Sequence, residues 1–290
     1  MSLDQLFDQF LRERIYVHNV TPKTRDWYQS AWHAFKQSQP TTPIEITKSD
    51  LLAFVVHLRE RGVKPVSCNT WLRAMNAFCR WLHEQGAAPT LVTLRPQRLE
   101  KRIIRTHDEA ALRVVLGYRP KTFEHWRVHA LILTILDTGC RITELLTASI
   151  TDFDLDNLLL TVYGKGRKER RVPMSFDLRK ILFRFGQVKE RAEVRSPLMF
   201  PSRDGGRWHQ RNALRSHYCL TKRLGLPRSG FHRLRHTFAT QYLRNGGEVV
   251  RLSIILGHSD VSTTMKYLHL LTEDVQRPHQ ALSVLGRLRR

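Results

Sequence analysis

Four short segments of the chain concentrate residue types that can bind a phosphate or move a proton. They are TGCRITEL (138–145), YGKGRKERRVP (163–173), HRLRHTFAT (232–240) and LGHSDVSTTMKY (256–267). Arginine presents a fork of N–H donors that matches phosphoryl oxygens, and histidine and tyrosine can exchange protons with a reacting group. Together the segments suit chemistry on a phosphate ester, although each has an ordinary structural explanation when it is taken alone.

The arginine of the first segment and the lysine of the second can each be read in two ways. Arg141 stands at an apparent helix start, where Glu144 is a ready ion-pair partner three residues on. Its functional reading is a phosphate clamp held in place by that glutamate. Lys165 lies between two glycines in a predicted hairpin turn, where a lysine is usually solvated but can also reach into a DNA groove.

The histidines and the tyrosine of the last two segments are similarly ambiguous. His232 and Arg235 are neighbours on a helix, so both can face one phosphate. His232 and His236 have a spacing that can hold a metal ion, but the segment lacks the glutamate of H-E-x-x-H and its arginines would repel a cation. We therefore expect no metal. His258 lies beside residues that can cap a helix, and Tyr267 lies on a predicted helix, where a tyrosine usually packs in the core.

The order of these segments resembles that of the tyrosine recombinase/integrase family. HRLRHTFAT resembles the family's H-x-L-R-H-x-x-A-T, LGHSDVSTTMKYLH resembles L-G-H-x-x-x-x-T-x-x-Y-x-H, and TGCRITEL resembles T-G-x-R-x-x-E-L. GKGRKERRVP resembles the β-hairpin lysine segment, and NTWLRAMNAFCRWLHEQG (69–86) resembles the last helix of the N-terminal core-binding domain. Motifs that follow one another in this order along nearly the whole chain argue strongly against a chance match.

This resemblance implies a specific reaction and assigns residues to it. Members of the family cleave DNA by attack of a tyrosine on a phosphodiester, which leaves a 3′-phosphotyrosine and a free 5′-hydroxyl. Matched residue by residue, Tyr267 is expected to be the nucleophile. Arg141 and Arg235 are expected to bind the non-bridging oxygens, and Lys165 to protonate the leaving 5′-oxygen.

The resemblance also assigns three supporting roles. His232 is expected to act as an acid/base near the tyrosine hydroxyl, and His258 to hydrogen-bond the phosphate. Glu144 is expected to orient the neighbouring catalytic residues without contacting the phosphate itself. The physics agrees, because a tyrosine of pKa near 10 is only about 0.1% ionised at pH 7, and ionising it costs roughly 4 kcal/mol unless a base or nearby cations help. We expect no cofactor, and no ATP because the covalent bond conserves the energy of the broken linkage.

The charge of the chain indicates a polyanionic partner. Lys and Arg number 48 against 26 Asp and Glu, which gives a net charge of +22. The resemblance makes the partner double-stranded DNA with specific recombination sites, on which the family assembles a tetramer. Residues 275–290 are expected either to dock on a neighbouring protomer or to touch DNA as a basic tail. We also expect DNA contacts from five basic residues: Arg73, Arg80, Arg167, Lys168 and Arg233.

The elements that must position these residues are mainly helical. Apolar spacing and capping signals predict helices over 2–17, 22–37, 48–61, 66–85, 107–117, 123–138, 141–148, 176–192, 207–224, 232–245, 247–256 and 261–274. Residues 158–163 and 170–174 read as two strands joined by the GKGRKE turn. The predicted fold class is therefore mainly α with a small antiparallel β-sheet.

The chain is long enough for two domains. Its first four helices predict a bundle over 1–92, which the resemblance identifies as a core-binding domain that clamps DNA. The charged, proline-containing stretch 93–105 reads as a linker, and 106–290 as an α+β catalytic domain with a C-terminal segment that contacts another protomer. No signal peptide, no C-x-x-C pair and no apolar run near the roughly 20 residues of a membrane span are present, so we expect a cytoplasmic protein without membrane contact.

Three other functions fit parts of the pattern. A type IB topoisomerase would share the chemistry without strand exchange, but the short chain and the recombinase-like N-terminal helix disfavour it. A non-catalytic DNA-binding protein of the same fold is expected to lack some of the catalytic residues, and all of them are present here. A basic RNA- or ribosome-associated protein would fit the charge but not the motifs. Among recombinases, the chain is similar to the short two-domain type of Xer-like, transposon or integron enzymes.

Overall fold

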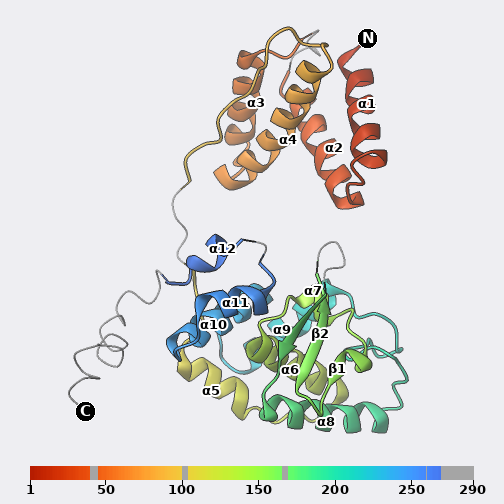
Figure 1. Ribbon diagram of the computed structural model, residues 1–290, viewed down its shortest axis with the longest axis vertical. Helices are drawn as coiled ribbons and strands as arrows, with labels where there is room; N and C mark the ends of the chain where they lie inside the picture. The colour runs from red at the N-terminus through yellow and green to blue at the C-terminus, as the bar shows by residue number, and fades with distance from the viewer. Residues whose placement is uncertain (40–44, 100–103, 165–168, 259, 269–290) are drawn as a thin grey trace, which may run out of the picture. The chain divides into compact units, whose positions relative to one another are not determined.

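The computed structural model describes residues 1–39, 45–99, 104–164, 169–258 and 260–268, which form two compact units, Met1–Arg102 and Ile103–Arg290 (Figure 1). Helices dominate both the first and the second unit, and the sheet of the described residues has three antiparallel strands in the order β1-β2-β3. The predicted fold class is confirmed. Within these residues, no helix is both long and apolar enough to cross a lipid bilayer.

The first unit is a bundle of helices held together by aromatic packing. Its helices are α1 (Leu3–Tyr16), α2 (Pro22–Gln37), α3 (Lys48–Glu60) and α4 (Pro65–Glu84). Helix α2 begins where the sequence predicted, because Thr21 caps it and Pro22 occupies its first turn. The rings of Phe7 and Phe10 pack against Phe78 of α4 at centroid distances of 5.1 and 5.4 Å. These contacts join α1 to the helix whose sequence resembles the core-binding domain.

Two buried asparagines of α4 fix the chain segment that follows the bundle. Asn69 exchanges two hydrogen bonds of 2.8 Å with the backbone of Gln97, and Asn76 exchanges bonds of 2.8 and 3.1 Å with the backbone of Leu94. Seven helical residues rise about 10.5 Å, close to the roughly 10 Å that three extended residues span. The segment from Leu94 to Gln97, which we predicted as the start of a linker, therefore lies along α4 in register.

The second unit places a small sheet beside a set of helices (Figure 1). Its elements are α5 (Glu109–Gly117), α6 (Phe123–Thr138), α7 (Ile142–Leu145), η1 (Ile150–Asp152), β1 (Phe153–Asp154), β2 (Leu159–Tyr163), β3 (Glu169–Pro173), α8 (Phe176–Arg191), α9 (Gln210–Arg223), α10 (Phe231–Arg244), α11 (Val249–Leu256) and α12 (Ser262–Met265). Helix α6 contacts α8, α9 and α10 and is buried over most of its length. It is therefore the central element on which α8, α9 and α10 pack.

The C-terminus of α6 is where the central helix meets α10. The helix ends at Gly139, which has a φ of +64°. A Cβ atom at this position would lie 2.3 Å from the ring of Phe238 on α10, so only glycine allows the two elements to approach this closely. Arg141 follows Gly139 by two residues, and Arg235 lies three residues before Phe238 on α10. Arg235 donates a hydrogen bond to the carbonyl of Gly139, which joins α10 to the segment that leads into Arg141.

The helix predicted over 261–274 is too long in its described part. Helix α12 covers only Ser262–Met265, and Tyr267 lies in a turn, where its N–H bonds the carbonyl of Thr264 at 3.0 Å. That bond spans three residues rather than four, which tightens the chain and ends the α-helix. Residues 269–274 lie outside the described residues. Helix 141–148 is likewise shorter than predicted, and the two-residue strand β1 was not predicted.

A buried histidine makes the stability of the second unit depend on pH. His217 of α9 is 1% exposed and stacks on Phe231, and burial lowers its pKa to about 4. The unfolded chain has a histidine pKa near 6.5, so the unfolded state binds more protons as the pH falls below that value. We expect a drop from pH 7 to pH 5 to remove roughly 2 kcal/mol of unfolding free energy through this residue alone.

Urea denaturation at both pH values measures this effect. The His217→Phe variant, whose ring can keep the stacking, should lose about 2 kcal/mol less than the wild type over the same pH step. Replacement of the exposed His209 by Gln is the matched control and should leave the loss unchanged. An unchanged loss in His217→Phe would contradict the assignment.

Candidate active site

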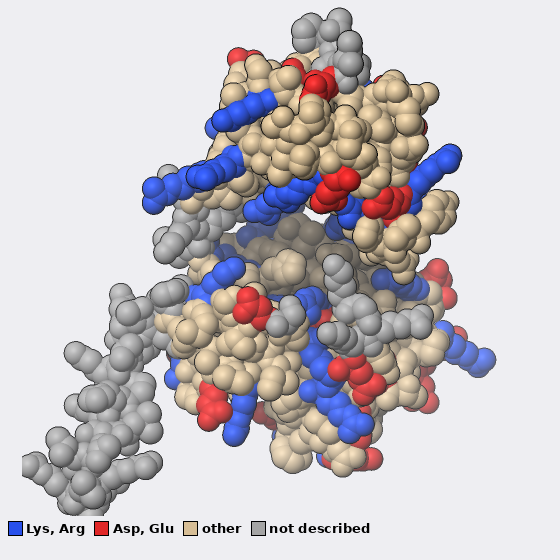
Figure 2. All heavy atoms as spheres, turned by 45° about the horizontal axis from the view of Figure 1, so that its top comes forward, with Lys and Arg blue, Asp and Glu red and all other residues tan. Residues whose placement is uncertain are grey.

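A hollow of about 1020 Å³ opens between α7, the sheet and the end of α11. Its wall holds three arginines and one histidine against two glutamates: Arg141, Arg170, Arg207 and His258, and Glu144 and Glu169. On the face drawn in Figure 2, Lys and Arg side chains of the described residues are spread over the surface, with Asp and Glu side chains among them. The hollow is therefore a basic cavity within a basic surface, which suits an anionic ligand.

Arg235 is the buried cation of this site. It is 5% exposed, and its Nη1 and Nη2 atoms each donate a 2.7 Å hydrogen bond, to the carbonyl oxygens of Gly139 and Leu256. These carbonyls lie at the C-terminal ends of α6 and α11, where the helix dipole favours a cation. Burial, followed by the charge of Arg141, lowers the pKa of Arg235 to about 10, so the side chain stays charged at neutral pH.

His258 lies against Arg235 and is neutral at physiological pH. Its Nε2 atom is 3.2 Å from Arg235 Nη2, and its Nδ1 atom is 2.7 Å from the hydroxyl of Thr264. Because a guanidinium only donates, Nε2 must accept and Nδ1 carries the proton. Burial, followed by the charges of Arg235 and Arg141, lowers the pKa of His258 to about 4. His258, which the resemblance expects to hydrogen-bond the phosphate, therefore lies beside Arg235 in the basic cluster.

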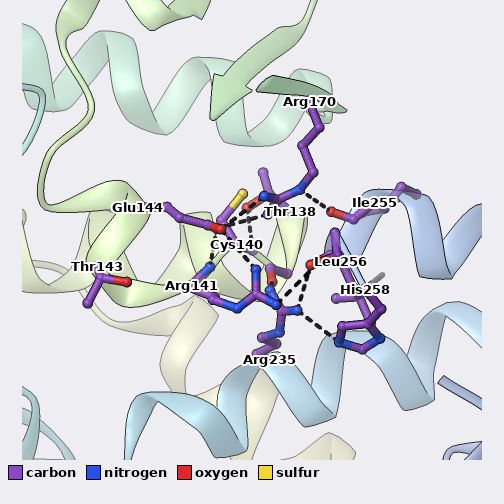
Figure 3. Close-up of polar contacts among 12 residues, drawn as sticks. Thr138, Cys140, Arg141, Thr143, Glu144, Arg170, Arg235, Ile255, Leu256 and His258 are labelled. Carbon is purple, nitrogen blue, oxygen red and sulfur yellow. Dashed lines mark hydrogen bonds and ion pairs between the residues drawn. The ribbon is translucent and has the colours of Figure 1, made fainter. Parts of the chain in front are cut away.

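Arg141 begins α7 and is held by Glu144, as the spacing predicted. Its Nη1 donates to Glu144 Oε1 at 3.0 Å, its backbone N–H donates to Oε2 at 2.8 Å, and its Nη2 lies 3.4 Å from the carbonyl of Gly257. Burial alone would raise the pKa of Glu144, but hydrogen bonds from Arg170 and Arg141 outweigh it and lower the pKa. Figure 3 shows that these side chains come from separate segments and point toward one another.

Tyr267 lies next to this cluster with its hydroxyl bonded to His236. The Tyr267 hydroxyl and His236 Nδ1 are 2.8 Å apart, and the tyrosine is 4% exposed. Burial raises the pKa of Tyr267, although the charge of Arg235 acts against it. Burial, with the charges of His232 and Arg235, lowers the pKa of His236. Both shifts favour uncharged forms, so a neutral phenol and a neutral imidazole share this bond.

The other predicted site residues either lie outside the described residues or are not hydrogen-bonded to this cluster. His232 is exposed on α10, and the structure shows no hydrogen bond from it to any described residue. Lys165, Arg167 and Lys168 lie outside the described residues, although Gly164 and Glu169 on either side of them line the hollow. Arg73 and Arg80 are exposed on α4. Arg233 donates bonds of 3.2 and 2.8 Å to the carbonyl of Thr106.

Two residues of the site were missed from the sequence. His236 was considered only as half of a metal-binding pair, yet it contacts the tyrosine hydroxyl. Arg170 was one basic residue in a charged hairpin, yet its side chain is 10% exposed and pairs with Glu144. Strand alternation offered a signal for Arg170, because it lies two residues from the buried Val172 and so shares its face of β3.

Comparison with known proteins identifies the family. The model of the phage integrase family matches residues 109–274. The chain belongs to this family. It is 31% identical to the tyrosine recombinase XerD of Brucella suis biovar 1 over 234 residues, which covers 75% of this chain and 76% of that one. It is 30% identical to the tyrosine recombinase XerD of Pseudomonas putida over 292 residues, with 94% and 95% covered.

Solved structures agree with this assignment. The recombinase is similar to the crystal structure of XerA recombinase, with a TM-score of 0.55, 25% identity and coverage of 97% and 98% of the two chains. The Tn1549 transposon integrase in complex with circular intermediate DNA has the same fold, with a TM-score of 0.77, 20% identity and coverage of 92% and 95%. The chain is thus a tyrosine site-specific recombinase, and neither a topoisomerase nor a non-catalytic DNA-binding protein is favoured.

Proposed function

We propose that the recombinase cleaves DNA through Tyr267, which attacks a phosphodiester and forms a 3′-phosphotyrosine bond. Arg141 and Arg235 would hold the non-bridging oxygens, and His258 would hydrogen-bond the phosphate. The observation that carries this proposal is the buried guanidinium of Arg235, held by two helix ends and His258 beside the hollow that Arg141 lines. A charged group fixed in this way stabilises the negative charge that builds up on phosphorus in the transition state.

The two remaining catalytic roles are proposed from the motif match. Lys165 would protonate the leaving 5′-oxygen, which the position of Gly164 and Glu169 on the wall of the hollow supports. His232 would act as the acid/base for the tyrosine hydroxyl. In this structure the hydroxyl bonds His236 instead, and Tyr267 is buried, so the proposed role of His232 requires that the hydroxyl exchange its bond to His236 for one to His232. We infer that the structure corresponds to a resting arrangement of the nucleophile.

Formation of a covalent adduct tests the proposal as a whole. The protein is mixed with a nicked suicide substrate that carries its native site, found by footprinting beside its gene, in the presence of EDTA. We expect an SDS-resistant protein–DNA adduct, and mass spectrometry of its tryptic peptides should place the nucleotide on Tyr267. Tight, site-specific binding without any adduct would contradict the assignment of the catalytic residues.

Paired variants of the two α10 histidines separate their roles. His232→Gln should lower the cleavage rate about 10²-fold, because general acid–base catalysis contributes at least that much. His236→Gln should change the rate less than about tenfold, since one neutral hydrogen bond is worth roughly 1 kcal/mol. The rates are measured in single-turnover reactions with the suicide substrate. A larger loss in His236→Gln would instead assign the acid/base role to His236.

We further propose that the partner is double-stranded DNA with specific recombination sites, bound by a homo-tetramer, and that the first unit is the core-binding domain. Arg73 and Arg80 support this, because they are exposed and lie seven residues apart on one face of α4. Residues 275–290, expected to contact another protomer or DNA, lie outside the described residues. Four free cysteines fit a reducing compartment, and we propose that the enzyme works in the cytoplasm.

The salt dependence of binding tests the phosphate contacts. If about 10 phosphates are contacted, the slope of log affinity against log salt should be near −9. Arg73→Gln and Arg80→Gln should each reduce the magnitude of that slope by about 1. Fluorescence anisotropy over a salt series gives the slope, and variants that keep the wild-type value would remove these two residues from the interface.

A further inference from the structure

Arg170 lies next to Glu144 and connects the chain segments that carry Arg141 and His258. The side chain leaves β3 and is 10% exposed. Its Nη1 donates to Glu144 Oε1 at 2.9 Å and its Nη2 to Glu144 Oε2 at 2.8 Å, while its Nε donates to the carbonyl of Ile255 at 2.8 Å. One guanidinium therefore ties the sheet to α7 and to the last turn of α11, as Figure 3 shows.

Glu144 is shared between two arginines. Its Oε1 accepts from Arg141 Nη1 as well as from Arg170 Nη1, and its Oε2 accepts from the Arg141 backbone and from Arg170 Nη2. If Glu144 paired with Arg141 alone, the carboxylate would cancel the charge that Arg141 brings to a phosphate. With Arg170 present the three side chains, all of which line the hollow, carry a net charge of +1, so the pairing of Glu144 with Arg141 no longer cancels the positive charge.

Arg170 also defines the path of the chain into His258. Helix α11 ends at Gly257 with a φ of +63°, and a Cβ at this position would lie 3.0 Å from the Cζ, Nε and Nη1 atoms of Arg170. The glycine therefore serves two purposes, because it adopts the left-handed turn and makes room for the guanidinium. The carbonyl of Gly257 lies 3.4 Å from Arg141 Nη2, so the same turn touches both arginines.

We propose that Arg170 is a positioning residue for DNA cleavage. It neutralises the charge of Glu144, so that Arg141 keeps its own charge for the phosphate, and it holds the Gly257–His258 turn in place. This inference rests on the proposed roles of Arg141 and His258. Arg170 itself has little exposed surface, and its Nε, Nη1 and Nη2 atoms all donate hydrogen bonds to other groups of the protein. Its loss should therefore reduce the rate of cleavage much more than the affinity for DNA.

The test uses Arg170→Gln, Arg170→Lys and the double variant Glu144→Gln/Arg170→Gln. Single-turnover adduct formation on the suicide substrate gives the cleavage rate, and gel shifts with intact DNA give the affinity. Arg170→Gln should cleave about 10²-fold more slowly than the wild type, with an affinity within about threefold. Arg170→Lys should also be slow, because an ammonium group cannot reproduce a bidentate fork plus a third bond.

The double variant distinguishes charge balance from simple stabilisation of the fold. It removes the unpaired buried carboxylate that Arg170→Gln leaves behind, so it should cleave about tenfold faster than Arg170→Gln. The matched control is Arg171→Gln, the exposed neighbour on β3, which should cleave at the wild-type rate. Thermal melts of each variant show that the reactions are run below its unfolding temperature.

Two results would overturn the positioning role. One is an Arg170→Gln variant that cleaves at the wild-type rate while folded, which would make the ion pair purely structural. The other is a loss of DNA affinity as large as the loss of rate, which would make Arg170 a binding residue. Failure of the proposed function is a different result, because the wild-type protein itself then forms no adduct, and the positioning role falls with it.

Discussion

Tyr267→Phe is expected to abolish the covalent protein–DNA adduct while the affinity for DNA stays within about twofold. The change removes one hydroxyl and leaves the ring, which packs in a cluster with residues of α10 and α11. The lost bond to His236 should cost only about 1 kcal/mol of stability. Because the hydroxyl oxygen is the attacking atom, the cleavage rate should fall on the order of 10⁶-fold. Denaturing gels of a time course on the suicide substrate measure it.

A second tyrosine provides the control for this experiment. Tyr163 lines the hollow beside Arg141 and His258, at the end of β2, and is 54% exposed, so Tyr163→Phe removes a hydroxyl that a DNA strand could reach. We expect this variant to form the adduct at nearly the wild-type rate. An adduct that persists in Tyr267→Phe and disappears in Tyr163→Phe would place the nucleophile on β2 instead.

Arg235→Lys is expected to slow cleavage by about 10²–10³-fold, as for the loss of one fixed donor to the transition state. A lysine keeps the positive charge, but its single ammonium group cannot bond Gly139, Leu256 and His258 in the geometry of the planar fork. Burial already lowers the pKa of the arginine to about 10. A lysine has an ordinary pKa roughly two units lower than arginine, so the same site would bring it closer to losing its charge.

Single-turnover rates and thermal melts separate catalysis from folding in this variant. Arg244→Lys, at the exposed end of the same helix, is the matched control and should behave as the wild type in both measurements. If Arg235→Lys retained the wild-type cleavage rate, Arg235 would be a structural cation that links α6 to α11 and not a phosphate ligand.

The elements of this fold could be predicted closely wherever local signals define them. Helices 22–37 and 123–138 were predicted with the bounds that the structure shows, because a capping threonine begins each and, in the second, Gly139 ends it. The hairpin strands were predicted to within one residue, since apolar alternation and a glycine turn mark them. The helix over 261–274 failed because Tyr267 turns its side chain into a cluster formed by other helices, which no local signal records.

The candidate site shows the same division between local and tertiary information. The pairing of Arg141 with Glu144 follows from their spacing on one helical turn, and the structure confirms it. His232 and His236 lie one turn apart on α10, and their spacing alone cannot tell which of them meets Tyr267. Arg170 was hidden in a hairpin whose other basic residues suggested solvent exposure. Its partners, Glu144 and Ile255, are 26 and 85 residues away.

The wide separation of the site residues along the chain has a consequence for how the enzyme is made. Arg235 bonds a carbonyl 96 residues before it, and Arg141 reaches one 116 residues after it. Contacts between such distant residues form late in folding, because closing long loops costs chain entropy before any contact repays it. A partly synthesised or partly refolded chain therefore carries its positive charge before its active site has assembled. Such a chain can adhere to a chromosome through its charge, but it cannot nick it.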